Sequence, residues 1–109
     1  MKKGDLVLAH IQFTDFSGTK IRPGLVLAPE NSERDVILAF ITSQTQKQDQ
    51  SSVLVSPKEA PSSGLKKESI IKLNRITTLN ENIILGKIGS LPSEMLEEVD
   101  HNLRKLFQL

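Results

Sequence analysis

The spacing of apolar residues changes once along this chain, near Pro92. Before Pro92, short apolar runs alternate with clusters of turn residues, which is the pattern of β-strands. After it, apolar residues recur every three or four positions, at Met95, Val99, Leu103 and Leu106. That spacing is typical of an amphipathic helix. The sequence therefore predicts a mainly β fold that ends in a C-terminal α-helix over about residues 93–107.

The strands can be placed from alternation and from the turn residues between them. We expect strands over 6–13, 25–27, 35–42, 53–55, 69–75 and 83–91, with polar connections at 14–20, 30–33, 43–52, 57–67 and 77–82. The run Asp35–Thr42 is apolar on both faces, so it should be the central and most buried strand. At 109 residues and with no internal repeat, the chain should form one domain, residues 1–109.

Composition excludes several classes of protein and of site. The chain has no cysteine, which excludes disulfides, thiolate metal ligands and a cysteine nucleophile. It has no Trp or Tyr and four Phe, which argues against an aromatic platform for stacked bases. There is no P-loop, no HExxH and no Cys/His cluster, so we expect neither a cofactor nor a metal.

The N-terminal segment and the hydropathy bear on location. Lys2 and Lys3 are followed by Asp5, and no cleavage pattern of small residues comes after them, so we read no signal peptide. No apolar run approaches the length needed to span a bilayer. A cytoplasmic protein without a membrane partner is the default expectation.

The charge is unevenly distributed although the net charge is only +1. Residues 1–90 carry 12 basic and 9 acidic residues, whereas residues 91–109 carry 2 and 4. An anionic ligand should therefore bind to the first part of the chain rather than to the helix.

The first candidate site residue is Arg22. It precedes Pro23, follows a polar loop and leads into the apolar run after Gly24. Proline pushes the residue before it toward extended geometry, so we expect Arg22 at a strand entrance, with its guanidinium aimed at the loop. A planar guanidinium suits phosphate or carboxylate. The alternative is an ordinary surface charge.

Two further groups of polar residues lie at strand ends. Thr42, Ser43 and Gln44 follow the expected central strand; they would be either a strand cap or a set of neutral hydrogen-bond donors. Lys72 and Asn74 should lie side by side on one face of an extended segment. That face would be either a binding surface or the solvated side of an amphipathic strand.

Together these groups would stabilise an anion. RNA carries its own nucleophile, the 2′-hydroxyl, beside each phosphate. A protein that orients the phosphate and stabilises the added negative charge could therefore cleave RNA without a metal.

Four blocks of the sequence, in order, are GDLVLAHIQFTD…KIRPGLVLA, ILAFITSQ, ESIIKLNRITTLN and GKIGSL, followed by an acidic amphipathic helix. In these blocks the chain resembles the PemK/MazF family, the toxins of bacterial type II toxin–antitoxin modules. The resemblance implies a small SH3-like β-barrel of short antiparallel strands with a C-terminal helix, working as a homodimer. It further implies metal-independent cleavage of single-stranded RNA, and inhibition by a cognate antitoxin whose acidic tail occupies the RNA groove.

The resemblance also assigns roles to individual positions. Arg22 and Thr42 match residues associated with catalysis in the family, and Lys72 and Asn74 lie where several members carry an arginine and an aspartate as acid/base partners. We therefore predict catalytic roles for these four residues. The predicted RNA-binding residues are Lys20, Ser43, Gln44 and Arg75.

Asparagine cannot take up a proton as a carboxylate does. The departure at Lys72 and Asn74 therefore leaves a second interpretation open. On that interpretation the same barrel is a catalytically inactive module that binds RNA or a protein.

Overall fold

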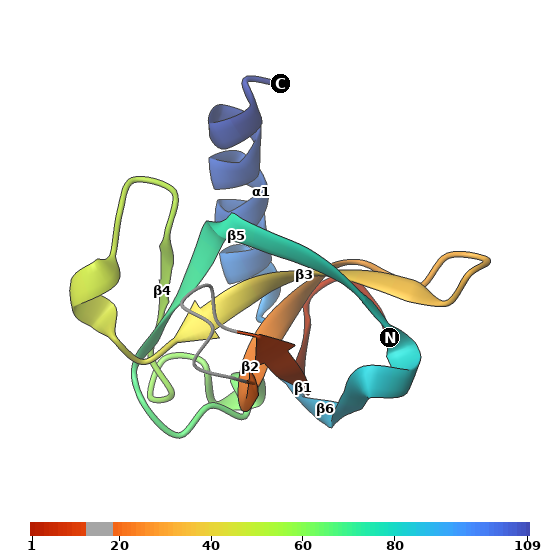
Figure 1. The fold of residues 1–109 in the computed structure, drawn as a ribbon. Coiled ribbons are helices and arrows are strands. Elements are labelled where there is room, and N and C mark those ends of the chain that lie inside the picture. Colours follow the sequence, from red (N-terminus) through yellow and green to blue (C-terminus); the bar gives the residue numbers. More distant parts are fainter. Residues whose placement is uncertain (13–18) are drawn as a thin grey trace.

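The computed structural model describes residues 1–12 and 19–109 and shows six strands and one long helix (Figure 1). The strands are β1 (Asp5–Gln12), β2 (Thr19–Ala28), β3 (Asp35–Thr42), β4 (Val53–Val55), β5 (Ser69–Asn80) and β6 (Ile84–Ser90). The helix α1 spans Ser93–Phe107, as the sequence predicts, and three short 3-10 turns are η1 (Thr45–Lys47), η2 (Pro61–Ser63) and η3 (Glu81–Ile83).

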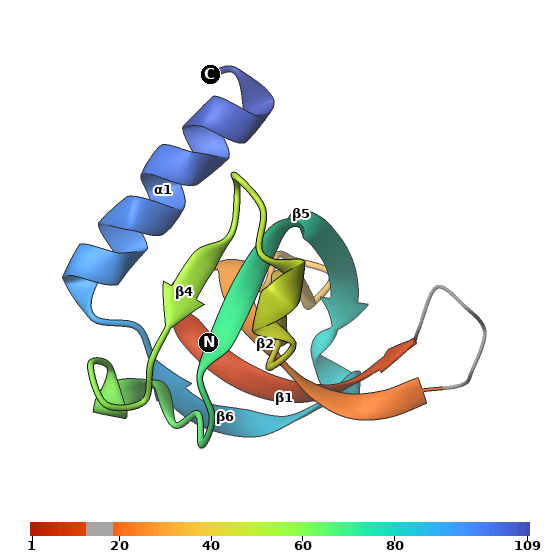
Figure 2. The same ribbon diagram turned by 90° about the vertical axis from the view of Figure 1, so that its left-hand side faces the viewer.

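All six strands belong to one antiparallel sheet in the order β4-β5-β3-β2-β1-β6. The sheet curves strongly (Figure 2) but does not close, because its two edge strands, β4 and β6, do not pair with each other. The predicted mainly β fold with a C-terminal helix is confirmed, and the term barrel describes the curvature only approximately.

The main core lies between the sheet and α1. Leu6, Leu25, Ile71 and Leu73 are fully buried there, together with Val99 of the helix. Successive residues of a strand point to opposite faces, so the alternation seen in the sequence sends this apolar set to the helix side. A smaller cluster on the other face is formed by Val7, Val26, Val36 and Leu38.

At the β6 edge of the sheet, the backbone of β6 lies very close to the backbone of η2 and of the residue that follows it, Gly64. A Cβ atom on Gly89 would collide with the backbone of Ser62 and Ser63, and one on Gly64 would collide with the backbone of Ile88. Gly64 also has a φ of +75°, which L side chains rarely adopt. The Ser62 hydroxyl donates a hydrogen bond to the Ser90 carbonyl oxygen, 2.9 Å away, across the same junction.

Two strands are longer than the sequence predicts. β2 begins at Thr19 rather than at Leu25, so Arg22 lies within a strand and not at its entrance. Pro23 is compatible with this position because the pairing of β2 with β3 begins only at Gly24. β5 continues to Asn80, so residues 77–80 are not a connection; they pair with the first half of β3.

Three smaller expectations have different outcomes. β3 is central in the sheet order, but Ile37 is exposed, so β3 is not buried on both faces as predicted. The expected loops 43–52 and 57–67 contain η1 and η2. Phe13 and most of the predicted loop 14–20 lie outside the described residues, and Thr19 and Lys20 belong to β2.

The junction between η2 and β6 provides a test of the fold. We expect Gly89→Ala to destabilise the protein by about 1–3 kcal/mol, because the added methyl group must push two backbone segments apart. Gly86→Ala is the matched control, since a Cβ there meets nothing within 4 Å on the same strand. Denaturant unfolding of both variants measures the difference, and equal midpoints would contradict the proposed close approach.

Candidate functional site

The pairing of three central strands brings most of the predicted site residues to one face of the sheet. Gly24 of β2 pairs with Phe40 of β3, and Phe40 pairs with Lys72 of β5. Arg22 is two residues before Gly24, and Thr42 is two residues after Phe40, so alternation places both on the face that carries Lys72. This is the face opposite the helix-side core, and we call it the Arg22 face.

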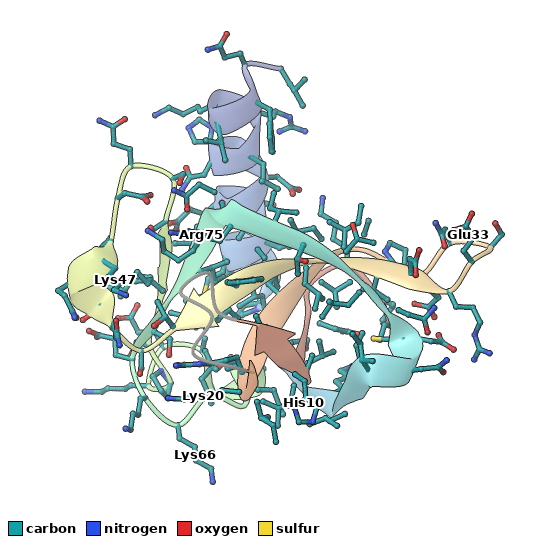
Figure 3. All side chains as sticks on the ribbon, viewed as in Figure 1. His10, Lys20, Glu33, Lys47, Lys66 and Arg75 are labelled. Carbon is teal, nitrogen blue, oxygen red and sulfur yellow. The ribbon has the colours of Figure 1, made fainter. Side chains whose placement is uncertain are left out.

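Arg22 and Lys20 follow each other along β2 on this face. They pair with Ala9 and Ile11 of β1, respectively. Arg22 is half-buried and Lys20 is exposed; Lys20 is labelled in Figure 3, near the start of β2. Pairing with β1 fixes the backbone position of Arg22, and a planar guanidinium suits recognition of a phosphate.

Thr42 lies at the end of β3 and caps the strand. Its Oγ1 accepts a hydrogen bond from the backbone N–H of Gln44 at 3.1 Å. The cap interpretation is therefore confirmed. It does not exclude a second role, because a hydroxyl that accepts one hydrogen bond can still donate another. Ser43 and Gln44 are exposed beside it.

Lys72 and Asn74 lie side by side, as alternation predicts, but both contact a third residue. Lys72 Nζ donates to Asp49 Oδ2 at 2.7 Å and to the Lys47 carbonyl oxygen at 2.8 Å. Asn74 Nδ2 donates to the same Asp49 oxygen at 3.3 Å. Asp49 comes from the segment between β3 and β4, and the sequence analysis did not select it.

The segment that carries Asp49 contacts β5 through these hydrogen bonds. It contains η1 and stands in front of β5 and β2 in Figure 2. Figure 3 shows Lys47 on this segment at one end of the molecule, whereas Glu33 lies at the other end. The ammonium group of Lys72 therefore lies at the end of the sheet where η1 is, held by its hydrogen bonds to this segment.

The carboxyl group of Asp49 is held as an anion. The hydrogen bond from Lys72 lowers its pKa most, the hydroxyl of Ser51 lowers it further, and burial opposes them only partly, so the pKa lies well below the ordinary value of 3.8. Oδ1 accepts from the Ser51 N–H at 2.9 Å, the Ser51 hydroxyl at 2.8 Å and the Ser52 hydroxyl at 3.1 Å. The site thus contains a carboxylate that is negatively charged at neutral pH and that the sequence did not predict.

Arg75 lies at an irregular part of β5. Ala39 pairs with Ile76 while the next residue, Phe40, pairs with Lys72. The register shift leaves Leu73, Asn74 and Arg75 between these two pairs. Bulges of this kind are common next to functional sites because they redirect side chains. Leu73 is buried and Arg75 is exposed (Figure 3).

A cavity of about 530 Å³ opens next to the Arg22 face. Phe40 belongs to its wall and also pairs with Lys72, so the cavity and the candidate site adjoin. The other residues that line it are His10, Ile11, Thr77, Leu79, Asn82, Ile83 and Leu85. Within residues 1–12 and 19–109, no three His, Cys, Asp or Glu side chains are grouped so that they could hold a metal ion.

Comparison with known proteins identifies the family. The sequence model of the family described as "PemK-like, MazF-like toxin of type II toxin-antitoxin system" matches residues 2–107. The chain belongs to this family.

One relative and two structures illustrate the similarity. The chain is 33% identical over 94 residues to endoribonuclease MazF6 of Mycobacterium tuberculosis, a match that covers 83% of this chain and 81% of the relative. The fold is shared with M. tuberculosis toxin MazF-mt6, with a TM-score of 0.72, 21% identity and coverage of 94% and 97% of the two chains. It is also shared with a MazE-MazF structure from Deinococcus radiodurans, with a TM-score of 0.77, 19% identity and coverage of 100% and 97%.

Hydropathy adds one finding about membranes. Among the helices in the described part of the chain, none combines the length and the apolar character that crossing a membrane requires.

The ion pair at Asp49 should make stability depend on pH. The pKa of Asp49 is lower in the folded protein than its ordinary value of 3.8. Its contribution is therefore present above about pH 4 and is lost as the pH falls through the lower, folded pKa. We expect the difference in unfolding free energy between the wild type and Asp49→Asn to shrink as the pH is lowered from 6 to 3. Denaturant titrations across this range measure it, and a constant difference would contradict the assignment.

Proposed function

We propose that this chain is the toxin of a type II toxin–antitoxin module and an endoribonuclease. It cleaves single-stranded RNA by attack of a 2′-hydroxyl on the adjacent phosphate and requires no metal. Membership of the PemK/MazF-like family supports the proposal, as does the name endoribonuclease given to the relatives that are 33% identical. The observation that carries it is the strand register, which gathers Arg22, Thr42 and Lys72 on one face.

In the proposed reaction the RNA supplies the nucleophile and the protein stabilises the negative charge that develops. The 2′-oxygen forms a bond to phosphorus and the bond from phosphorus to the 5′-oxygen breaks, which leaves a 2′,3′-cyclic phosphate and a 5′-hydroxyl. The 2′-hydroxyl loses its proton and the departing 5′-oxygen gains one. Between these steps phosphorus carries additional negative charge on its non-bridging oxygens, which fixed donors stabilise strongly.

Each site residue has a proposed role in that scheme. The guanidinium of Arg22 contacts two phosphate oxygens, which its planar fork suits. The hydroxyl of Thr42 donates to the same phosphate, and Lys72 and Asn74 bind it or a neighbouring one. Lys20, Ser43, Gln44 and Arg75, all exposed beside these residues, hold the flanking nucleotides.

The partners follow from the same proposal. The excess of basic residues over 1–90 suits RNA and the acidic tail of a cognate antitoxin, and the protein acts in the cytoplasm, where mRNA lies. A homodimer is supported by the exposed apolar side chains Leu106 and Phe107 at the end of α1. These two side chains are available for contact with a second copy of the chain.

The first test removes the guanidinium. We expect Arg22→Ala to lower the rate of RNA cleavage in EDTA by about 100- to 1,000-fold, since charge stabilisation of this kind is typically of that size. Arg104→Ala, an exposed arginine on α1, should cleave as the wild type does. Retention of RNA without any product by the wild type would instead favour the inactive binding module, and equal cleavage by all three proteins would contradict the role of Arg22.

The second test separates the two roles of Thr42. Thr42→Ser keeps the hydroxyl and Thr42→Val removes it while preserving the shape of the side chain. We expect the valine variant to lose about 100-fold or more in rate and the serine variant to stay within a few-fold of the wild type. Thermal unfolding of both variants reports on the lost cap. Cleavage by the valine variant at the wild-type rate would limit Thr42 to its structural role.

A further inference from the structure

The carboxylate of Asp49 has all of its acceptor positions occupied. It receives five hydrogen bonds: two on Oδ2, from Lys72 and Asn74, and three on Oδ1, from Ser51 and Ser52. A carboxylate offers about four lone-pair positions. No position remains for the proton of a substrate hydroxyl, so Asp49 cannot serve as the proton acceptor in this arrangement.

The two oxygens of Asp49 have different neighbours. Oδ1 is held by residues two and three positions later in the same turn, so those bonds fix the local shape of the segment. Oδ2 faces β5 and neutralises Lys72, the residue that carries positive charge beside Asn74 on the Arg22 face. Oδ2 therefore takes the place on these two donors that an oxygen of a phosphate would take.

We propose that Asp49 is an internal competitor for RNA, whose carboxylate a phosphate must displace from Lys72 and Asn74 when the substrate binds. This inference rests on the proposed function and adds to it a residue that sets the affinity for RNA. Lys72 Nζ also holds the carbonyl oxygen of Lys47. Displacement releases the two hydrogen bonds that Lys72 and Asn74 donate to Asp49 and leaves the one from Lys72 to the Lys47 carbonyl oxygen. It thereby couples RNA binding to a movement of the segment 43–52.

The surroundings of Asp49 permit such an exchange. Residues 46–50 are all exposed, and the side chain of Asp49 is 36% exposed. The Lys72 side chain is 15% exposed, so solvent reaches the pair mainly from the Asp49 side. A phosphate oxygen is an anionic acceptor as the carboxylate oxygen is, so it can take over the same donors. Lysine suits an exchange of partners because its ammonium is a compact charge with three donors that rotate.

The experiment measures binding to a 2′-O-methylated single-stranded RNA, which lacks the nucleophile and cannot be cleaved. We expect Asp49→Asn to bind it roughly two- to tenfold more tightly than the wild type at low salt. Asp100→Asn is the matched control, because Asp100 also forms a 2.7 Å ion pair with a lysine, Lys3, and its side chain is 32% exposed. That variant should bind as the wild type does.

A double-mutant cycle with Lys72→Gln separates displacement from general repulsion. In the Lys72→Gln background the effect of Asp49→Asn should disappear, since no lysine is left to release. An unchanged effect in that background, or equal tightening by Asp100→Asn, would overturn the proposal. This binding arm does not depend on cleavage, so it tests the competitor even if the protein cuts no RNA.

Cleavage kinetics provide the second readout. If Asp49 competes with RNA, Asp49→Asn should lower KM by a similar two- to tenfold factor and leave kcat within about twofold. A loss of kcat with binding retained would mean that the carboxylate takes part in the reaction itself, and would overturn the competitor role while leaving the proposed function intact.

Discussion

The backbone pairing of β3 with β2 on one side and β5 on the other is the constraint on which the rest of the structure depends. The most distant residues that it pairs, Asp35 and Asn80, are 45 positions apart in the sequence. Because side chains alternate along each strand, the register of these pairs determines which side chains lie on each of the two faces of the sheet. Leu25, Ala39 and Ile71 go to the core under α1, and Arg22, Thr42 and Lys72 go to the other face. The candidate site is thus the reverse side of the hydrophobic core.

Much of this fold can be predicted from local patterns. The change of period near Pro92 places α1 correctly, because an amphipathic helix on a sheet leaves a clear apolar stripe. The predicted start of β2 and the predicted end of β5 are wrong. For β5 the reason is that polar, β-branched residues such as Thr77 and Thr78 occur in connections as well as in strands. Their pairing with Ile37 and Leu38 is what keeps them extended, and a partner distant in the sequence leaves no local signal.

The same distinction explains the site. Alternation predicts that Lys72 and Asn74 lie together, and their shared contact with Asp49 confirms that placement, whereas their part in catalysis stays a prediction. Asp49 itself lies 23 residues from Lys72 in the sequence, within a run of glutamine and serine that has no periodicity. Nothing local marks it as a partner, so only the folded chain reveals the negative charge within a cationic surface.

The pairing of a strand lysine with a loop aspartate has a consequence for exchanges at either position. An arginine in place of Lys72 could form two parallel hydrogen bonds with the Asp49 carboxylate, so a phosphate would displace that carboxylate less readily. Exchange of Lys72 for arginine alone would therefore make the displacement of Asp49 by a phosphate harder. Removal of the carboxylate at position 49 together with that exchange would relieve the competition.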